Sequence, residues 1–272
     1  MNNFSKRTIT GFSFIGIVIA SVVIHPLVFA GLFLIVALLS LREFFNLVTT
    51  DQIKPLLIPT YFSVIFIYVS FWGWKYLFPE HPKYLSLNII VLFLPFIIQL
   101  YRKSEKPFHN IAYTLLGVFY IVFPFILLGS FYFIIYPTEG ISYGVLFGFF
   151  GIIWISDTGA YLVGSLIGKH RLFKRISPKK SWEGSIGGGI FAIGGAVLSW
   201  YLFGALLVWQ WVILAIIILI VGTLGDLVES LLKRSLGVKD SGSILPGHGG
   251  LLDRFDNVFL SAPFVFVYLM II

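Results

Sequence analysis

Cysteine is absent from all 272 residues, so the protein has no disulfide bonds, thiolate metal sites or cysteine nucleophiles. Charged residues are scarce at 11% of the chain, whereas hydrophobic residues make up 58% and phenylalanine alone occurs 29 times. Soluble domains usually carry about 25% charged residues. The composition therefore excludes an ordinary soluble domain and indicates a polytopic membrane protein.

Apolar stretches long enough to cross a bilayer recur along the chain, because a hydrocarbon core about 30 Å thick requires roughly 20 helical residues. The first stretch follows Lys6 and Arg7, but no small-residue cleavage site separates it from the second, so we interpret it as a helix and not as a signal peptide. The sequence predicts an all-α, polytopic membrane helix bundle with about nine transmembrane helices. The predicted spans are approximately 9–24, 26–48, 56–78, 84–101, 111–135, 141–168, 186–204, 206–232 and 257–272.

The basic residues predict the orientation of these spans. Of the 19 Lys and Arg residues, 17 belong to the amino terminus and to the connections that follow the second, fourth, sixth and eighth spans, and only Lys75 and Lys83 fall on the other side. Positive charge concentrates in cytoplasmic loops. We therefore expect a cytoplasmic amino terminus, an external carboxyl terminus and two cytoplasmic loops, 169–185 and 233–256.

The acidic residues divide the chain into two parts. Up to residue 140 they fall at span edges or in loops, which suggests a transmembrane scaffold over 1–140. In 141–272, Asp157, Asp226 and Glu229 lie within the apolar spans themselves. Because an intramembrane charge is costly and needs a partner, we interpret 141–272 as the catalytic half.

Four polar residues near the end of the eighth span share one helix face. Asp226, Glu229, Ser230 and Lys233 follow i, i+3, i+4 and i+7 spacing. Glu229 and Lys233 have the spacing of an ordinary stabilising ion pair, and structural pairing is an alternative role for Asp226 as well.

The loop that follows is rich in glycine, so its backbone amides are able to approach a polyanion closely. It is flanked by cations and by acids, a mixture suited to a triphosphate with Mg²⁺. His248 is either an acid–base catalyst or a turn residue that donates a hydrogen bond to phosphate. The cations are Lys233, Arg234, Lys239 and Arg254, and the acids are Asp226, Asp240, Asp253 and Asp256.

The loop 169–185 contains six Lys and Arg residues. Lys179, Lys180 and Ser181 immediately precede an apolar helix, and cations before a helix start are typical of a phosphate site. The alternative is an anchor that binds acidic lipid.

Other function classes fit less well. The basic residues are confined to gaps between spans, which argues against nucleic acid as a partner. Ser230 and Lys233 lack an accompanying oxyanion motif, so a Ser-Lys hydrolase is disfavoured. A transporter remains a rival because intramembrane acids and glycines also line transport paths, although no internal repeat is visible.

The segment 230–256, SLLKRSLGVKDSGSILPGHGGLLDRFD, resembles the signature of the phosphatidate cytidylyltransferase family, and SDTGAYLVGSLIGK and ISPKKSWEG resemble further blocks of it. The resemblance implies transfer of CMP from CTP to phosphatidic acid with release of pyrophosphate. It also implies dependence on Mg²⁺, a homodimer, and a paired-cation site in which K⁺ is a candidate for the second ion. The same chemistry on another lipid phosphate or another nucleotide is the main alternative.

Two anions must meet in such a reaction, so the residues are assigned by charge. We expect Asp226 and Asp253 to hold Mg²⁺, Asp157 and Asp256 to support them or a second cation, and Lys239 and Arg254 to contact the triphosphate. His248 is a further catalytic candidate. The expected substrate-binding residues are Lys179, Lys180, Ser181, Lys233, Arg234, Gly249 and Gly250. The expected location is the inner or plasma membrane, with the site facing the cytoplasm.

Overall fold

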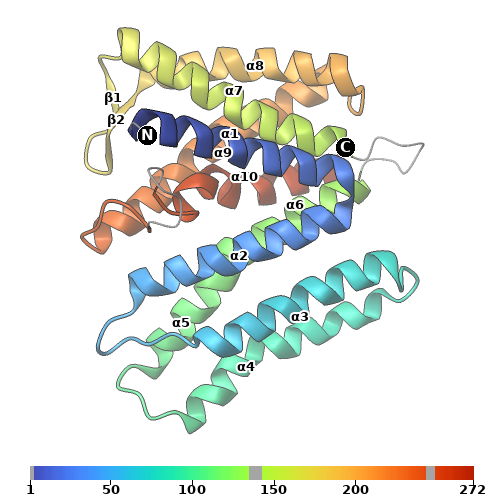
Figure 1. Cartoon of the computed structure of the whole chain (residues 1–272), viewed down its shortest axis with the longest axis vertical. Coiled ribbons are helices and arrows are strands. Elements are labelled where there is room, and N and C mark those ends of the chain that lie inside the picture. Colours follow the sequence, from blue (N-terminus) through green and yellow to red (C-terminus); the bar gives the residue numbers. More distant parts are fainter. Residues whose placement is uncertain (1–2, 135–142, 243–248) are drawn as a thin grey trace. The chain divides into compact units, whose positions relative to one another are not determined.

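The computed structural model describes residues 3–134, 143–242 and 249–272 (Figure 1). Their helices are α1 (Asn3–Ile24), α2 (Pro26–Val48), α3 (Leu57–Tyr76), α4 (Leu87–Tyr101), α5 (Pro107–Gly117), α6 (Phe123–Ile134), α7 (Gly144–Ile167), α8 (Trp182–Phe203), α9 (Val208–Ser235) and α10 (Leu252–Ile271). A 3₁₀ turn, Pro82–Ser86, leads into α4, and a π-helical turn, Val118–Val122, joins α5 to α6.

Within the described residues, eight helical segments are long and apolar enough to cross a membrane, and a ninth apolar stretch, Ser13–Ile24, lies in α1. The prediction of an all-α polytopic membrane bundle is confirmed. The other element is a short antiparallel hairpin of β1 (Arg171–Phe173) and β2 (Ser177–Ser181), which lies in the segment 169–185 that was expected to be a loop.

Several predicted helix ends were wrong because charged residues that end an apolar run do not end a helix. Helix α8 begins at Trp182 and not near 186, since the Ser181 hydroxyl accepts a hydrogen bond from the Gly184 amide (3.1 Å) and caps the helix. Helix α9 continues to Ser235, and α10 begins at Leu252 and not at 257. The predicted loop 233–256 is therefore much shorter, and Lys233 and Asp253 are helical residues.

The chain forms two compact units. One comprises Met1–Ile126 with Asp240–Leu252, and its core includes the stacked rings of Phe29 and Phe33 (4.2 Å between centroids). The other comprises Leu127–Lys239 with Asp253–Ile272, and its core includes Trp211 and Phe149.

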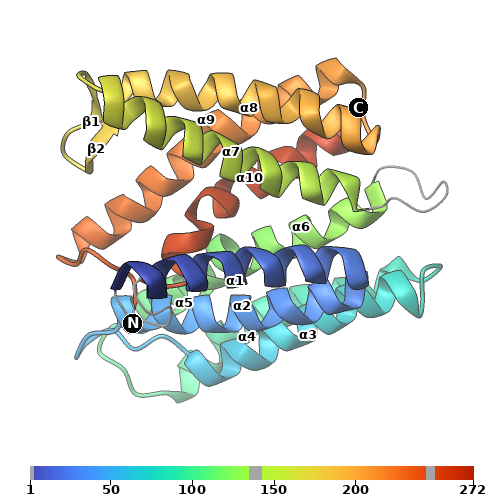
Figure 2. The ribbon, with the colours of Figure 1, turned by 45° about the horizontal axis from the view of Figure 1, so that its top comes forward.

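In the second unit, α7 and α8 lie side by side along their length, and the hairpin connects them at one end (Figures 1 and 2). Small residues permit this close approach. A methyl group added at Gly188 would lie 3.0 Å from the Ser156 carbonyl oxygen and 3.1 Å from Ala160 Cβ. Close backbone approach through small residues is the usual way in which helices associate in membranes.

Candidate functional site

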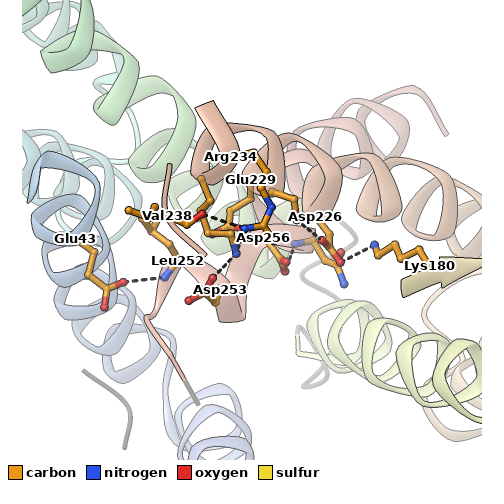
Figure 3. Close-up of polar contacts among 12 residues, drawn as sticks. Glu43, Lys180, Asp226, Glu229, Arg234, Val238, Leu252, Asp253 and Asp256 are labelled. Atoms are coloured by element: carbon orange, nitrogen blue, oxygen red, sulfur yellow. Dashed lines mark hydrogen bonds and ion pairs between the residues drawn. The ribbon is translucent and has the colours of Figure 1, made fainter. Parts of the chain in front are cut away.

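The polar face predicted on α9 is present, and it is tied to α10. Lys233 Nζ lies 2.5 Å from Glu229 Oε2 on the same helix and 2.5 Å from Asp253 Oδ1 on α10 (Figure 3). Asp226, one turn before Glu229, accepts a hydrogen bond from the Ser230 hydroxyl (3.3 Å). Lys233 thus links two acids from two helices in the second unit.

Asp226 also forms an ion pair with a lysine of the hairpin. Lys180, near the end of β2, places Nζ 2.5 Å from Asp226 Oδ2 (Figure 3). Both side chains are only partly buried, with exposed fractions of 27% and 28%, so the pair lies at the edge of a cavity rather than inside the core. The structure therefore joins one of the two basic segments of the sequence to the acidic face of α9.

Two further acids surround this pair. Asn257 Nδ2 donates to both oxygens of Asp157 (3.2 and 3.0 Å), and the Asn257 backbone amide donates to Asp256 Oδ1 (2.8 Å). Asp157 and Asp256 are both close enough to Asp226 and Lys180 to interact with them electrostatically. Residues of α7, β2, α9 and α10 thus meet around a single lysine.

Lys180 and three of the residues around it, Asp157, Asp226 and Asn257, line a cavity of about 620 Å³ in the second unit. Its polar part includes Asp157, Lys179, Lys180, Ser181 and Asp226, and Asn257 also reaches it. Ile153, Ile218 and Leu219 contribute apolar wall. A cavity with clustered charges beside apolar wall suits an amphiphilic ligand with an anionic end.

Asp226 and Asp253 were predicted to hold Mg²⁺, with Asp157 and Asp256 as supporting acids. Asp226 and Asp157 line the cavity, whereas Asp253 instead pairs with Lys233. The donor set at the cavity fits the ion. Aspartate and amide oxygens are the hard ligands that Mg²⁺ prefers. Asn257 Oδ1 is buried and accepts no hydrogen bond from any described residue, and the Lys180 ammonium shows that a cation is accommodated beside Asp226. No group of three or more acidic or histidine side chains in the described part of the chain is spaced to share one ion.

A sequence model of the Cytidylyltransferase family matches residues 5–272. Proteins named phosphatidate cytidylyltransferase from Staphylococcus haemolyticus, Staphylococcus epidermidis and Staphylococcus aureus are each 36% identical to this chain, and each alignment covers 87% of both proteins. The chain belongs to the cytidylyltransferase family.

Membership of the cytidylyltransferase family decides between the two classes of function left open by the sequence. Intramembrane acids and glycines alone are compatible with a transport path. A family match over nearly the whole chain, with relatives named as transferases, identifies an enzyme of the nucleotidyltransferase class. The transporter interpretation is set aside.

In this cytidylyltransferase, the predicted site residues occupy distinct places. Asp157, Lys179, Lys180, Ser181 and Asp226 line the cavity, and Asp256 interacts with its charges. Asp253 and Lys233 form the bridge between α9 and α10.

Other predicted residues lie at helix ends and in the connecting segment. Arg234 donates to the Val238 carbonyl oxygen (3.1 Å) at the end of α9, and Lys239 and Arg254 are exposed. Gly249 adopts a left-handed backbone (φ 79°), which a residue with a side chain rarely adopts, and Gly250 is buried. His248 lies outside the described residues.

Asn257 was missed by the sequence reasoning. It lies directly after Asp256, and an amide in the first turns of an apolar helix was a signal available in the sequence. The predicted span began at 257 and so placed Asn257 at its boundary. Because α10 in fact begins at Leu252, Asn257 lies within the helix.

Proposed function

We propose that this protein transfers the CMP group of CTP to the phosphate of phosphatidic acid and releases pyrophosphate, which yields CDP-diacylglycerol for phospholipid synthesis. One observation carries the proposal. In a chain 36% identical to phosphatidate cytidylyltransferases, Lys180 and Asp226 meet at a cavity that has both charged and apolar wall.

The chemistry requires that a lipid phosphate oxygen attack the α-phosphorus of CTP although both groups are anionic. Neutralisation and in-line positioning are then the main tasks of the protein. Lys180 and Lys179 supply positive charge at the cavity. The Gly184 amide at the start of α8 already donates to the Ser181 hydroxyl, so the positive charge comes from the lysines and not from this amide. No covalent enzyme intermediate is needed.

Asp226, with one of the neighbouring acids Asp157 or Asp256 and the Asn257 side-chain oxygen, would hold Mg²⁺, because Mg²⁺ is usually bound by one or two carboxylates together with substrate phosphates. The ion, when bound, supplies charge that offsets the triphosphate. Asp253 pairs with Lys233. We retain Asp253 as a metal-ligand candidate, and to bind the ion it must release Lys233. K⁺ is retained as a candidate for a second cation.

Ile153, Ile218 and Leu219 provide a surface against which the glycerol and the first part of an acyl chain are able to pack. The arrangement suits a substrate that remains in the bilayer while its headgroup enters the cavity. We place the enzyme in the inner or plasma membrane with the cavity facing the cytoplasm, where CTP is present, and we expect a homodimer.

The proposal is tested by pyrophosphate release from the enzyme purified in detergent. Release is expected only when CTP, phosphatidic acid and Mg²⁺ are all present. Panels of other nucleoside triphosphates and of other lipid phosphates separate this reaction from the same chemistry on different substrates. Equal release with a different lipid phosphate and none with phosphatidic acid would overturn the substrate assignment.

A further inference from the structure

A buried acid lies in the first unit, far along the sequence from the acids of the proposed reaction. Glu43 is in the penultimate turn of α2, and only 3% of it is exposed. The sequence had placed it among acids at span edges and in loops of a scaffold. A carboxyl group enclosed in this way is costly unless it makes specific polar interactions.

Glu43 makes such an interaction with the start of α10. Its Oε2 accepts a hydrogen bond from the Leu252 backbone amide (3.0 Å), although the two residues are 209 positions apart (Figure 3). The first amides of a helix have no acceptor within the helix, so an acidic side chain there both completes a hydrogen bond and faces the positive end of the helix dipole. Glu43 therefore caps α10 from another helix.

The same carboxyl group contacts both sides of the glycine-rich segment. A methyl group added at Gly242 would lie 2.5 Å from Glu43 Oε1, and one added at Gly250 would lie 2.5 Å from Oε2. Any side chain at either position would displace the carboxyl group. Gly242, Gly250 and Leu252 are thus fitted around one carboxyl group.

We propose that Glu43 is a positioning residue of this cytidylyltransferase: it clamps the two ends of the glycine-rich segment and the first amide of α10. The inference rests on the proposed function for its kinetic consequence only. Gly249 and Gly250, which were predicted to bind substrate, directly precede this part of the chain, and Asp253 directly follows Leu252. Glu43 acts through these groups and does not itself touch substrate.

The test combines local hydrogen exchange with kinetics on the full-length enzyme in detergent. In Glu43→Ala, the amides of peptides covering 249–255 should exchange about 10-fold faster, and kcat/KM for CTP should fall about 10-fold, since a lost helix cap has an effect of this size. Glu43→Gln keeps an oxygen acceptor for the Leu252 amide, so exchange and kcat/KM should both stay within about 3-fold of wild type.

Asn110→Ala is the matched control. Asn110 is fully buried in the same unit and accepts a hydrogen bond from the Lys54 backbone amide (2.7 Å), so it resembles Glu43 in burial and in bonding. Its loss should leave exchange over 249–255 and the KM for CTP unchanged. A general loss of stability would move both variants alike.

Gly242→Ala tests the clamp with Glu43 retained, because the added methyl group must push the carboxyl group away. Gly242→Ala should accelerate exchange over 249–255 as Glu43→Ala does. It provides the test of the clamp if Glu43→Ala fails to fold. The positioning role is overturned if exchange over 249–255 stays at the wild-type rate in both Glu43→Ala and Gly242→Ala. If Glu43→Ala cannot be purified, a wild-type rate in Gly242→Ala alone overturns it. A wild-type enzyme that makes no CDP-lipid instead overturns the proposed function, and the exchange measurement is unaffected by that result.

Discussion

Lys180 and Lys233 each pair with acids of α9, but their surroundings differ. Lys233 is 12% exposed and Glu229 only 1%, whereas Lys180 and Asp226 are both more than a quarter exposed. Removal of one partner from a buried charge pair leaves an uncompensated charge, while an exposed pair contributes little to stability. Lys233 is therefore mainly structural, and Lys180 is available to a ligand.

Replacement of these lysines by methionine should separate the two roles. Lys233→Met leaves Glu229 and Asp253 facing each other and should lower the melting temperature in detergent by about 10 °C, because such losses cost about 3–5 kcal/mol. Lys180→Met should change the melting temperature by no more than about 3 °C.

Addition of Glu229→Gln to Lys233→Met removes one of the opposed charges and should recover part of the loss. If Lys180→Met were the more destabilising substitution, or if the double variant recovered nothing, the assignment of Lys233 to structure would be wrong.

At the scale of the helix, the position of the hairpin and of Lys180 depends on the packing of α7 against α8. Gly188 lies in this contact, and Gly194, on the same helix, has no atom within 4 Å of the place where its Cβ would be. The two glycines form a matched pair for a test of the contact.

Gly188→Val should push α8 away from α7 and lower the melting temperature by about 2–10 °C, as expected for overpacking that costs about 1–3 kcal/mol. Gly194→Val should have little effect. The measurement is thermal unfolding in detergent, and equal shifts for the two variants would mean that α7 and α8 do not pack closely at Gly188.

The helices were predictable from the sequence because long apolar runs have few alternatives in a membrane, but their ends were not. The predicted spans were ended where an apolar run meets a group of charged residues, whereas α9 continues through Lys233 and Arg234 and α10 starts before Asp253. The spacing of Asp226, Glu229 and Lys233 correctly indicated one helix face. The bonds of Glu43 and Asn257 were not predictable, since they join residues that are distant in sequence and no local pattern encodes such pairs.

At the scale of the whole molecule, nine helical segments in the described residues agree in number with the count from which the topology was predicted. The orientation itself remains a prediction from the 17 to 2 distribution of basic residues. It assigns the hairpin to the cytoplasm and the connection between α3 and α4 to the outside.

Cysteine labelling tests this orientation directly, because the chain has no cysteine of its own. Lys174→Cys in the hairpin and Lys83→Cys before α4 are both at exposed positions. In oriented vesicles, an impermeant thiol reagent should label Lys174→Cys from the cytoplasmic side only and Lys83→Cys from the outside only. Labelling of both from one side would exclude the predicted topology.

We propose that CMP, and not a terminal phosphate, moves from CTP to the lipid under the control of the acids around Lys180. The most direct measurement follows radioactive phosphorus placed at either the α or the γ position of CTP, in detergent with phosphatidic acid and Mg²⁺. We predict that the α label appears in the lipid and the γ label in pyrophosphate. Asp226→Asn should slow both by at least about 100-fold, the scale on which a preorganised charge contributes to a transition state, whereas Glu105→Gln, an exposed acid of the first unit, should not. Transfer of the γ label to lipid, or of no label at all, would contradict this account.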